Sequence, residues 1–480
     1  MIPHACIVYN RKKMKRKKMT EWITKSLFCR VFIVVAFIQS SFAQSTQHPN
    51  IILILTDDLG WSCFSAKMDD RISASKSDYY ETPNIDRLMA QSMRFTRGYA
   101  PDPICSPSRR SIQFGQTSIR QGDESFPGLV RDIAHQSIPA VLKAFDSQYR
   151  AAHFGKWDLR AKITPAQLGY DESDGDTGNK TGDLVKDKNE KWTKHYITGN
   201  PKQMDSITAR SVRFMQEQVK TKHPFYLQVS HYATHVNFES KQSSYEKFKS
   251  KKPGLKHNNP AWAAMIYDLD ASVGELLNMV EHLGIANNTY IFLMADNGAV
   301  EFIPPVRNRL DPPSSFQSPM TNFPLRGGKW TLYEGGIRVP FIAKGPGIKA
   351  GVQSDIPVAG WDLLPTFNEL AGNTKKPGGT IDGASLVSVL KHGGKGTITR
   401  LSNDFFFHRY NNSYPHSAII AGDYKLIKFW KTNKTELYNI SKDPGEINDL
   451  SSREVSRVKE MERRLLTYIN EVNPELAKRY

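Results

Sequence analysis

Three stretches of the chain are predominantly apolar over the length of a β-strand. They span residues 50–55, 225–230 and 290–295. Apolar runs of this kind are typical of parallel strands that are buried on both faces of a sheet. The first run is followed by Asp57-Asp58 and the third by Asp296-Asn297. We therefore predict three buried strands, two of which end in polar pairs.

A long amphipathic helix is predicted over residues 260–283. Its apolar side chains recur at the helical spacing of three and four residues: Met265, Ile266, Leu269, Val273, Leu276, Leu277, Val280 and Leu283. Gly284 ends it, and Thr82 before Pro83 predicts the N-cap of another helix. Because helices alternate with buried strands, we expect an α/β fold with a large doubly wound mixed sheet flanked by helices.

The pattern changes near residue 395. Residues 391–399 are rich in Gly, Lys and Thr, which favours a linker. Beyond them we expect three short antiparallel strands and an amphipathic helix, at residues 418–421, 424–430, 436–439 and 455–472. The expected organisation is a large domain over residues 44–395 and a small α+β subdomain over residues 396–480.

The first 43 residues have the composition of a signal peptide. A basic stretch precedes an apolar run over residues 27–38, and Ser41-Phe42-Ala43 fits a small-x-small cleavage site. The run is shorter than the about 20 residues of a spanning helix, although an uncleaved membrane anchor is the alternative. We expect residues 1–43 to be removed and the mature protein to be exported, with no stable membrane insertion.

Composition and charge exclude several classes of protein. An apolar fraction of 39% excludes a disordered chain. The net charge is +17, but nine basic residues and one acidic residue lie in the first 43, so the mature chain carries +9. That charge suits an anionic substrate, and because no concentrated basic stripe is visible we expect no nucleic-acid partner. After cleavage only Cys63 and Cys105 remain, so at most one disulfide can form.

The polar pairs at the strand ends are candidate metal ligands. In sheets of this type, sites form at the carboxyl ends of the strands. Adjacent carboxylates repel each other, and a hard cation would relieve that repulsion. Ca²⁺ takes carboxylate and amide oxygens, whereas Zn²⁺ prefers His or Cys. Either pair alone is more often a solvated turn. The candidate ligands are Asp57, Asp58, Asp296 and Asn297.

The segment Cys105-Ser106-Pro107-Ser108-Arg109 is the most specific chemical signal in the chain. A lone cysteine is usually a buried structural residue. Here Pro107 predicts the first turn of a helix, which would place Cys105 at the positive end of the helix dipole, where an anion is stabilised. The pattern C-x-P-x-R is also the signal by which sulfatases have their cysteine oxidised to formylglycine.

Five motifs in order make the chain resemble the formylglycine-dependent sulfatases of the alkaline-phosphatase superfamily. Besides the cysteine motif, the matching segments begin at Pro83 (PNIDRL), Phe154 (FGKW), Leu325 (LRGGKWTLYEGGIRVP) and Glu436 (ELYN, with DPGE after it). The resemblance covers nearly the whole mature chain. It implies an alkaline-phosphatase-like fold and the hydrolysis of a sulfate ester.

The resemblance also implies a nucleophile and a metal site. Cys105 would become formylglycine (3-oxoalanine) through a formylglycine-generating maturation enzyme. One hydroxyl of its hydrate would attack sulfur, and the second would then lose a proton so that sulfate is eliminated. One Ca²⁺ would be held by the modified Cys105 together with Asp57, Asp58, Asp296 and Asn297. Asp296 would also be able to take the proton of the nucleophile.

Four further residues match the family's catalytic positions. Arg109 would hold the diol, and Lys156 and Lys329 would bind sulfate oxygens and offset developing charge. His235 would bind the substrate and protonate or orient the leaving oxygen. His231 competes for that role, because the family usually shows P-H-x-P here and this chain reads T-H-V-N.

Asp158 is the clearest departure from the family. The family has a His two residues after the Lys of G-K-W, and that His helps to expel sulfate. We expect Asp158 to face the site as a base or a substrate contact, although another residue could substitute or the second half-reaction could be slow. We also expect the proline-rich stretch over residues 301–321 to shape the pocket, with Arg307 or Arg309 touching the sugar.

Two other functions remain open from the sequence. One is a phosphodiesterase or phosphonate hydrolase of the same superfamily, because phosphate and sulfate esters share tetrahedral geometry. The other is an inactive exported sugar-binding protein, against which the intact cysteine motif and metal ligands argue. The scarcity of cysteine pairs fits a bacterial periplasm, so the expected substrate is a sulfated polysaccharide or its oligosaccharide fragments.

Overall fold

The computed structural model describes residues 48–122, 134–160, 163–182, 195–301, 321–410 and 414–479. The expected signal peptide, Arg307 and Arg309 lie outside these residues. Residues 48–480 belong to one compact unit. None of the helices in the described ranges is both long and apolar enough to cross a lipid bilayer. The expected boundaries after residues 43 and 395 stay predictions.

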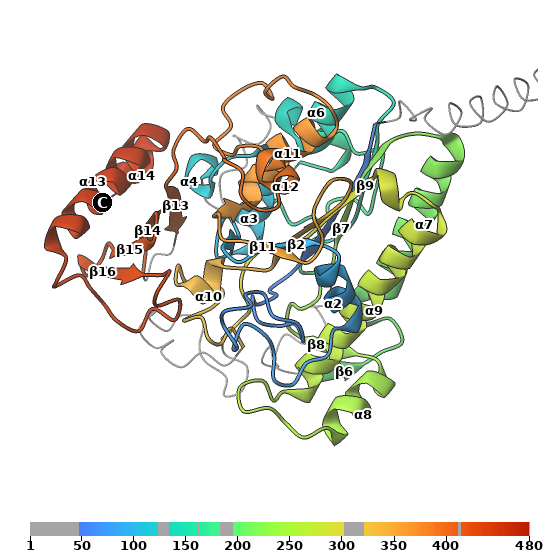
Figure 1. The fold of residues 1–480 in the computed structure, drawn as a ribbon, viewed down its shortest axis with the longest axis horizontal. Helices are drawn as coiled ribbons and strands as arrows, with labels where there is room; N and C mark the ends of the chain where they lie inside the picture. Colours follow the sequence, from blue (N-terminus) through green and yellow to red (C-terminus); the bar gives the residue numbers. More distant parts are fainter. Residues whose placement is uncertain are drawn as a thin grey trace, which may run out of the picture. The chain divides into compact units, whose positions relative to one another are not determined.

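An eight-stranded mixed sheet forms the centre of the fold (Figure 1). Its order is β11-β2-β10-β9-β1-β7-β4-β5. The strands are β1 (Asn50–Thr56), β2 (Met93–Phe95), β4 (Arg150–Gly155), β5 (Glu172–Ser173), β7 (Phe225–Ser230), β9 (Thr289–Ala295), β10 (Phe341–Lys344) and β11 (Val352–Ser354). β1 pairs in parallel with both β7 and β9, whereas β10 is antiparallel to both of its neighbours. The three predicted apolar strands are therefore the middle of the sheet.

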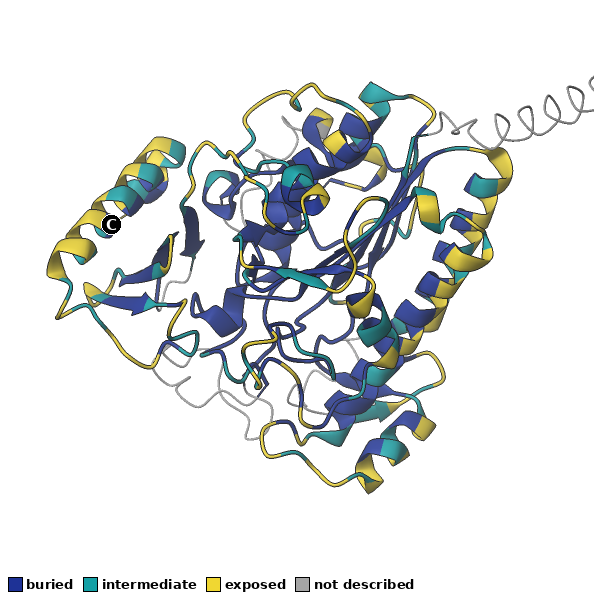
Figure 2. Ribbon diagram, viewed as in Figure 1, coloured by how far each residue is buried: buried dark blue, intermediate teal, exposed yellow. Residues whose placement is uncertain are grey.

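Helices cover both faces of this sheet (Figure 1). One layer holds α2 (Pro83–Ala90), α7 (Met204–Thr221) and α9 (Pro260–His282), and the other holds α3 (Cys105–Phe114), α6 (Ile138–Phe145), α11 (Leu363–Leu370) and α12 (Val387–Lys391). Figure 2 shows a buried sheet between helices whose outer sides are exposed. The predicted α/β fold with a large mixed sheet is confirmed, and the long helix ends one residue before the predicted Leu283.

Shorter elements complete the main body. They are β3 (Gly98–Tyr99), β6 (His195–Ile197), β8 (Phe238–Ser240), β12 (Val358–Ala359), α4 (Ser118–Gln121), α8 (Gln242–Ser250) and α10 (Glu334–Ile337). Short 3-10 turns lie at Ala134–Gln136, Ala166–Leu168, Pro201–Gln203, Ala286–Asn288 and Gly360–Asp362.

The C-terminal region is a four-stranded antiparallel sheet covered by a helix. Its strands are β13 (Phe405–Arg409), β14 (His416–Ala421), β15 (Tyr424–Phe429) and β16 (Lys434–Asn439), followed by α13 (Val455–Val472) and α14 (Pro474–Ala477). α13 buries Met461, Leu465 and Ile469 against one face of the sheet. The three predicted strands and the helix are confirmed, and β13 is an additional strand at the edge.

The predicted N-cap of α2 is only partly right. Thr82 precedes the helix and Pro83 is its first residue, but the Thr82 side chain makes no capping hydrogen bond. Its hydroxyl instead donates to Asp86 Oδ1 at 2.9 Å. Two N–H groups of the first turn, which have no partner within the helix, donate instead to a side chain of α9. The Asp270 carboxylate accepts from Asn84 N at 3.1 Å and from Ile85 N at 2.7 Å. A partner distant in the chain has replaced the local cap.

Candidate active site

The parallel register of β1 and β9 brings the two polar pairs together. Thr56 lies opposite Ala295, so Asp57 and Asp296 leave the sheet side by side. Asp58 turns back in the left-handed backbone region with φ of 57°, a conformation that Asp tolerates better than most residues. Its backbone N–H donates to Asp296 Oδ1 at 3.3 Å. The strand ends thus form one polar cluster at the carboxyl edge of the sheet, as predicted.

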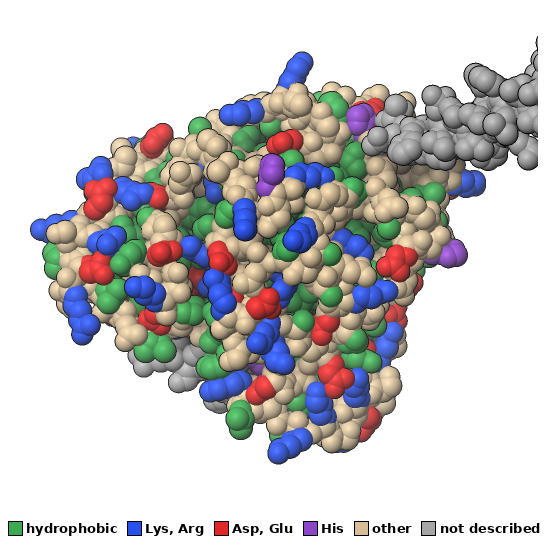
Figure 3. Space-filling model, in the orientation of Figure 1, with side chains coloured by type: hydrophobic (Ala, Val, Ile, Leu, Met, Phe, Trp, Pro, Cys, Tyr) green, Lys and Arg blue, Asp and Glu red, His purple; other side chains and the backbone are tan. Residues whose placement is uncertain are grey.

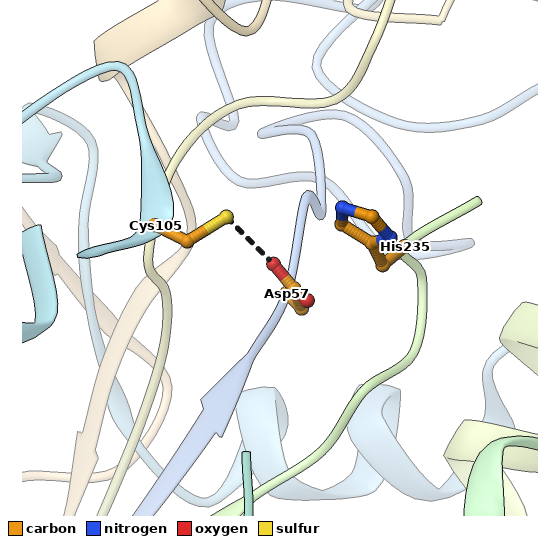
Figure 4. Close-up of side chains that lie close together, drawn as sticks. All are labelled: Asp57, Cys105 and His235. Atoms are coloured by element: carbon orange, nitrogen blue, oxygen red, sulfur yellow. Dashed lines mark hydrogen bonds between the residues drawn. The ribbon is translucent and has the colours of Figure 1, made fainter. Parts of the chain in front are cut away.

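Cys105 is the first residue of α3 and points into this cluster. Its Sγ lies 3.2 Å from Asp57 Oδ1, and Lys329 Nζ lies 3.3 Å from the same sulfur. Figure 4 shows Cys105 at the start of the helix, Asp57 after β1 and His235 in the loop after β7, with their side chains converging. The predicted helix start is confirmed. Cys63 and Cys105 are both free and buried, so the disulfide that the sequence left open is not formed.

Three carboxylates and one amide side chain can hold a cation next to Cys105. One ligand atom each from Asp57, Asp58, Asp296 and Cys105 lies within 4.8 Å of the others. Asn297 Nδ2 donates to Asp58 Oδ1 at 2.7 Å, and Asn297 Oδ1 is buried without a hydrogen-bond partner. A buried oxygen without a partner beside three carboxylates fits a hard cation such as Ca²⁺. The predicted ligand set therefore fits this ion.

Three buried cations each contact one of the three carboxylates. Every one of these side chains is at most 5% exposed. The contacts are Lys156 Nζ to Asp57 Oδ2 at 2.6 Å, Lys329 Nζ to Asp58 Oδ2 at 2.9 Å and Arg109 Nε to Asp296 Oδ2 at 2.7 Å. Each cation and its carboxylate offset the cost of burying the other because the two charges are so close. Two of the three cations, Lys156 and Lys329, also approach the space above Cys105.

Two glycines allow the backbone to pack closely beside Lys156 and Asn297. Gly155, which precedes Lys156, has φ of 98°, and a Cβ there would lie 2.0 Å from Ser230 O. Gly298, which follows Asn297, approaches Gly335 so closely that a Cβ would lie 1.8 Å from the Gly335 carbonyl oxygen. A larger residue at either position would push the lysine loop or the metal ligand out of place.

The three carboxylates have different proton affinities. Burial alone would raise the pKa of Asp57, but the charge of Lys156 and its neighbours holds that pKa well below the ordinary value. Burial raises the pKa of Asp58 in spite of Lys329. Burial and then the charge of Asp57 raise the pKa of Asp296 to about 7. Burial thus disfavours the charged forms of Asp58 and Asp296, and a bound divalent cation would favour them.

The thiol of Cys105 is not activated in this environment. Burial, and then the negative charge of Asp57, raise its pKa well above the ordinary value. A thiolate is the nucleophilic form of cysteine, so the unmodified residue is a poor nucleophile here.

The structure separates the two candidate histidines. His235 Nε2 lies 3.8 Å from Asp58 Oδ2, and its Nδ1 lies 2.6 Å from Val236 O. His231 points away from the cluster to α9, where its Nε2 lies 3.4 Å from Ser272 Oγ. Because a carbonyl only accepts, Nδ1 of His235 carries the hydrogen. Burial, and then the charge of Lys329, keep the pKa of His235 well below its ordinary value. The neutral ring presents its Nε2 lone pair to the site.

Asp158 lies at the edge of the same cluster. Its Oδ2 is 3.5 Å from Lys156 Nζ, and its Oδ1 accepts from Arg160 Nε at 3.2 Å. The residue is 5% exposed and has φ of 49°. The ammonium group of Lys156 therefore lies near two carboxylates, those of Asp57 and Asp158.

Arg109 contacts the frame of the site. Besides Asp296, it donates from Nη1 to the backbone oxygen of Lys156 at 2.6 Å. It thereby joins α3 to a metal-ligand candidate and to a lysine loop.

Sequence reasoning missed two polar residues that hold the site together. Asn322 donates through Nδ2 to Ala299 O at 2.9 Å and to Gly327 O at 3.2 Å. Thr234 donates from its hydroxyl to the backbone oxygen of Asp58 at 3.0 Å. Neither residue lies in a charged motif, and only their position beside a motif could have marked them.

The arrangement can bind and polarise a tetrahedral anion. Lys329 lies 3.3 Å from Cys105 Sγ at the positive end of α3, and Lys156 contacts Asp57 beside it. Figure 4 shows the ring of His235 on the other side of Asp57 from Cys105. Converging cations in a buried site stabilise charge that develops in group transfer. Sulfate and phosphate esters both fit this description.

Comparison with known proteins helps to decide between a sulfate and a phosphate ester as the substrate. The family model described as "Sulfatase" matches residues 49–373, and the model described as "N-sulphoglucosamine sulphohydrolase, C-terminal" matches residues 328–473. A sulfatase of Formosa agariphila is 28% identical, with 86% of each chain covered. The N-acetylgalactosamine-6-sulfatase of Mus musculus is 28% identical and is covered over 79% of its length by 87% of this chain.

Similarity also extends to solved structures. The crystal structure of Ps i-CgsB in complex with k-i-k-neocarrahexaose superposes with a TM-score of 0.69 at 24% identity, covering 88% of this chain and 93% of that one. At this identity the likeness establishes a shared fold.

Proposed function

The chain belongs to the sulfatase family, and from this premise we propose that it removes sulfate from a sulfated carbohydrate with a formylglycine at position 105 and one bound Ca²⁺. The observation that carries the proposal is the meeting of three segments around one sulfur atom: the start of α3, the end of β1 and the loop that holds Lys329. Cys105 begins α3 within a C-x-P-x-R motif and contacts Asp57 at 3.2 Å and Lys329 at 3.3 Å.

The environment of Cys105 supports a modified residue. A raised thiol pKa leaves the cysteine protonated and weakly nucleophilic. Formylglycine would supply, as its hydrate, a hydroxyl nucleophile that does not depend on a thiolate. Calcium would be held by Asp57, Asp58, Asp296 and Asn297, and it would supply positive charge for the anionic group that is transferred.

In this proposal, Lys156 and Lys329 bind the sulfate group of the ester. Lys156 lies 2.6 Å from Asp57 and Lys329 lies 2.9 Å from Asp58. Both ammonium groups are buried, so their attraction for an anion is little screened by water. A sulfate between them gains negative charge on its oxygens as the ester bond breaks, and the fixed charges stabilise it.

His235 and Arg109 position the other groups. The Nδ1 hydrogen of His235 is engaged by Val236 O, so Nε2 accepts a hydrogen bond and favours the orienting role over proton donation in this tautomer. Arg109 fixes Asp296 and the Lys156 backbone, through contacts of 2.7 and 2.6 Å. Its role in this proposal is to hold the site together.

The proposed substrate is a sulfated polysaccharide or its fragments. The mature chain's charge of +9 attracts a polyanion. A structural neighbour was solved with a carrageenan-type hexasaccharide, which supports a carbohydrate substrate. We further propose export to the periplasm after removal of residues 1–43, and modification of Cys105 by a maturation enzyme.

The test is release of inorganic sulfate by protein made in a host that can install formylglycine. Sulfated oligosaccharides and matched aryl sulfate and aryl phosphate esters serve as substrates, and Cys105→Ala is the control. We expect sulfate release that Cys105→Ala abolishes, with aryl phosphate hydrolysed much more slowly. Faster hydrolysis of the phosphate ester would favour the phosphoesterase alternative. Calcium binding without any turnover would favour the sugar-binding alternative.

A further inference from the structure

A second cavity lies apart from the carboxylate cluster. Its volume is about 560 Å³, which is within the range of sites that bind small molecules. Its walls come from residues 73–81, from the loop over residues 251–257 after α8, and from Phe323. None of the five sequence motifs contributes to it.

Hydrogen bonds hold these walls in place. The Asp78 carboxylate accepts from the backbone N–H groups of Lys256 and His257, both at 3.0 Å. His257 Nε2 lies 3.2 Å from Thr321 O, and the rings of Tyr80 and His257 are 4.8 Å apart. Tyr80 and His257 are at most 4% exposed. The cavity is therefore a formed feature of the fold and not a gap between mobile side chains.

The cavity shares its framework with the reaction centre. Phe323 follows Asn322, whose side chain holds Ala299 O and Gly327 O. Ala299 O also accepts from the backbone N–H of Lys329 at 3.0 Å. The wall of the cavity and the lysine that faces Cys105 thus belong to one hydrogen-bonded segment.

Three lysines and two acidic residues line the cavity, so the formal charge of its lining is +1. Glu81 is paired with Lys247 at 2.6 Å and with Lys251 at 2.8 Å, and the Asp78 carboxylate accepts two backbone N–H groups. Lys256 Nζ sits 4.3 Å from the centre of the Phe323 ring, a cation–π contact that holds the ammonium group at the cavity. Lys76 is exposed and has no ion pair within the described part of the chain. At the lower edge of Figure 3, Lys and Arg side chains lie interleaved with Asp and Glu side chains.

We propose that this cavity is a second sugar subsite, which binds a sulfated unit of the same polymer whose ester lies at Cys105. Lys76 and Lys256 would attract the sulfate, and the hydroxyl groups that line the cavity, such as those of Ser73 and Ser77, would meet sugar hydroxyls. The inference rests on the proposed function, because it assumes a carbohydrate polymer as the substrate. It adds that the enzyme binds the negative charge of one sugar unit while it removes sulfate from another.

The test measures binding and turnover separately. Matured wild-type protein is compared with the double variant Lys76→Ala/Lys256→Ala and with Lys376→Ala, an exposed lysine that does not line the cavity. Dextran sulfate oligosaccharide is titrated calorimetrically at low salt, where surface charges are least screened. Neutral dextran and carboxymethyl dextran of the same length are the comparison probes. Hydrolysis of 4-nitrophenyl sulfate, which is too small to span both sites, reports on the reaction centre.

We expect the double variant to bind dextran sulfate about tenfold more weakly, because rim charges act mainly through electrostatic attraction. Turnover of 4-nitrophenyl sulfate and the affinity of Lys376→Ala should stay at the wild-type level. An unchanged affinity in the double variant, or an equal loss in Lys376→Ala, overturns the subsite. Equal weakening for carboxymethyl dextran overturns the preference for sulfate. The proposed hydrolysis is judged separately, by sulfate release from the wild type.

Discussion

At the scale of residues, the reaction centre is a balance of buried charges. Three carboxylates and three cations share a space from which water is largely excluded: Asp57 with Lys156, Asp58 with Lys329 and Asp296 with Arg109. Loss of one partner from such a pair leaves an uncompensated buried charge, which costs about 3–5 kcal/mol. A substrate anion and a divalent cation both enter this balance, so binding of each depends on the protonation of the carboxylates.

Calcium binding should therefore depend on pH. Asp296, with a pKa of about 7, must release a proton before it can ligate the cation. Because metal ligands must be deprotonated, the apparent calcium affinity should fall about tenfold for each pH unit below 7. Calorimetric titration of chelator-treated protein between pH 5 and pH 8 measures this. An affinity that stays constant across the interval would contradict the assignment of Asp296 as a ligand.

Asp158 is the residue at which this chain departs from its family, and its position 3.5 Å from Lys156 Nζ gives it a testable role. Asp158→Ala should lower kcat on the sulfated substrate at least about tenfold, since a general base contributes typically 10²–10⁴-fold. Asp158→His, which restores the family's residue, is the matched control and should retain more activity than the alanine variant. Equal activity of Asp158→Ala and wild type would remove the hypothesis.

At the scale of elements, contacts between distant segments set the site. The loop that carries Lys329 continues into α10, and α10 is held by the C-terminal sheet. Lys425 of β15 is fully buried between Glu334 at 3.1 Å and Glu446 at 2.8 Å. The Gly336 carbonyl of α10 accepts from Gly298 N at 3.0 Å, immediately after the candidate metal ligand Asn297. The C-terminal sheet thereby supports the reaction centre from outside the main sheet.

Lys425→Met should destabilise the protein strongly. Two buried carboxylates would lose their shared cation, and the free energy of unfolding should fall by about 3–5 kcal/mol. Denaturant unfolding of Lys425→Met and of Lys442→Met, an exposed lysine in the same region, gives the comparison. Adding Glu446→Gln to the first variant should recover part of the loss, because one buried negative charge is removed. A loss below about 1 kcal/mol in Lys425→Met would mean that the network is not stabilising.

The start of α2 offers a second test at this scale. Asp270 of α9 accepts from two backbone amides of the first turn of α2. Asp270→Ala leaves those buried amides without partners, and the free energy of unfolding should fall by about 1–3 kcal/mol. Glu275→Ala, an exposed change on the same helix, should have little effect. Equal unfolding midpoints for the two variants would show that α2 does not depend on this contact.

These two contacts illustrate what the sequence could and could not predict. The strands, the long helix, α13 and the meeting of Asp57 with Asp296 follow from local patterns and from the rule that parallel strands end at one edge. The role of Asp270 and the pairing of Lys425 with Glu334 depend on partners more than 90 residues away, which no local pattern encodes. Asn322 was missed although its partners Ala299 and Gly327 are only 23 and 5 residues away, because it bonds their backbone oxygens, which carry no sequence signal. The stretch that holds Arg307 and Arg309 lies outside the described residues.

At the scale of the whole molecule, the net charge and the lysines of the two sites both favour an anionic polymer as the substrate. Residues 44–480 carry a net charge of +9, two buried lysines contact the carboxylates around Cys105, and three lysines line a second cavity. Shortening the substrate should therefore raise KM more than it lowers kcat, because the distant unit contributes binding and takes no part in the chemistry. Initial rates of sulfate release from a length series of one sulfated oligosaccharide measure the effect. Equal KM values across the series would contradict this account of the whole molecule.

The central claim is that Cys105 acts as formylglycine, and the mass of the tryptic peptide over residues 98–109 tests it most directly. The protein must come from a host with the maturation machinery. We predict a peptide about 18 Da lighter than the unmodified sequence, the change from thiol to aldehyde that the C-x-P-x-R motif directs. A peptide that retains the full mass of a cysteine thiol, from protein made in a competent host, would contradict the claim.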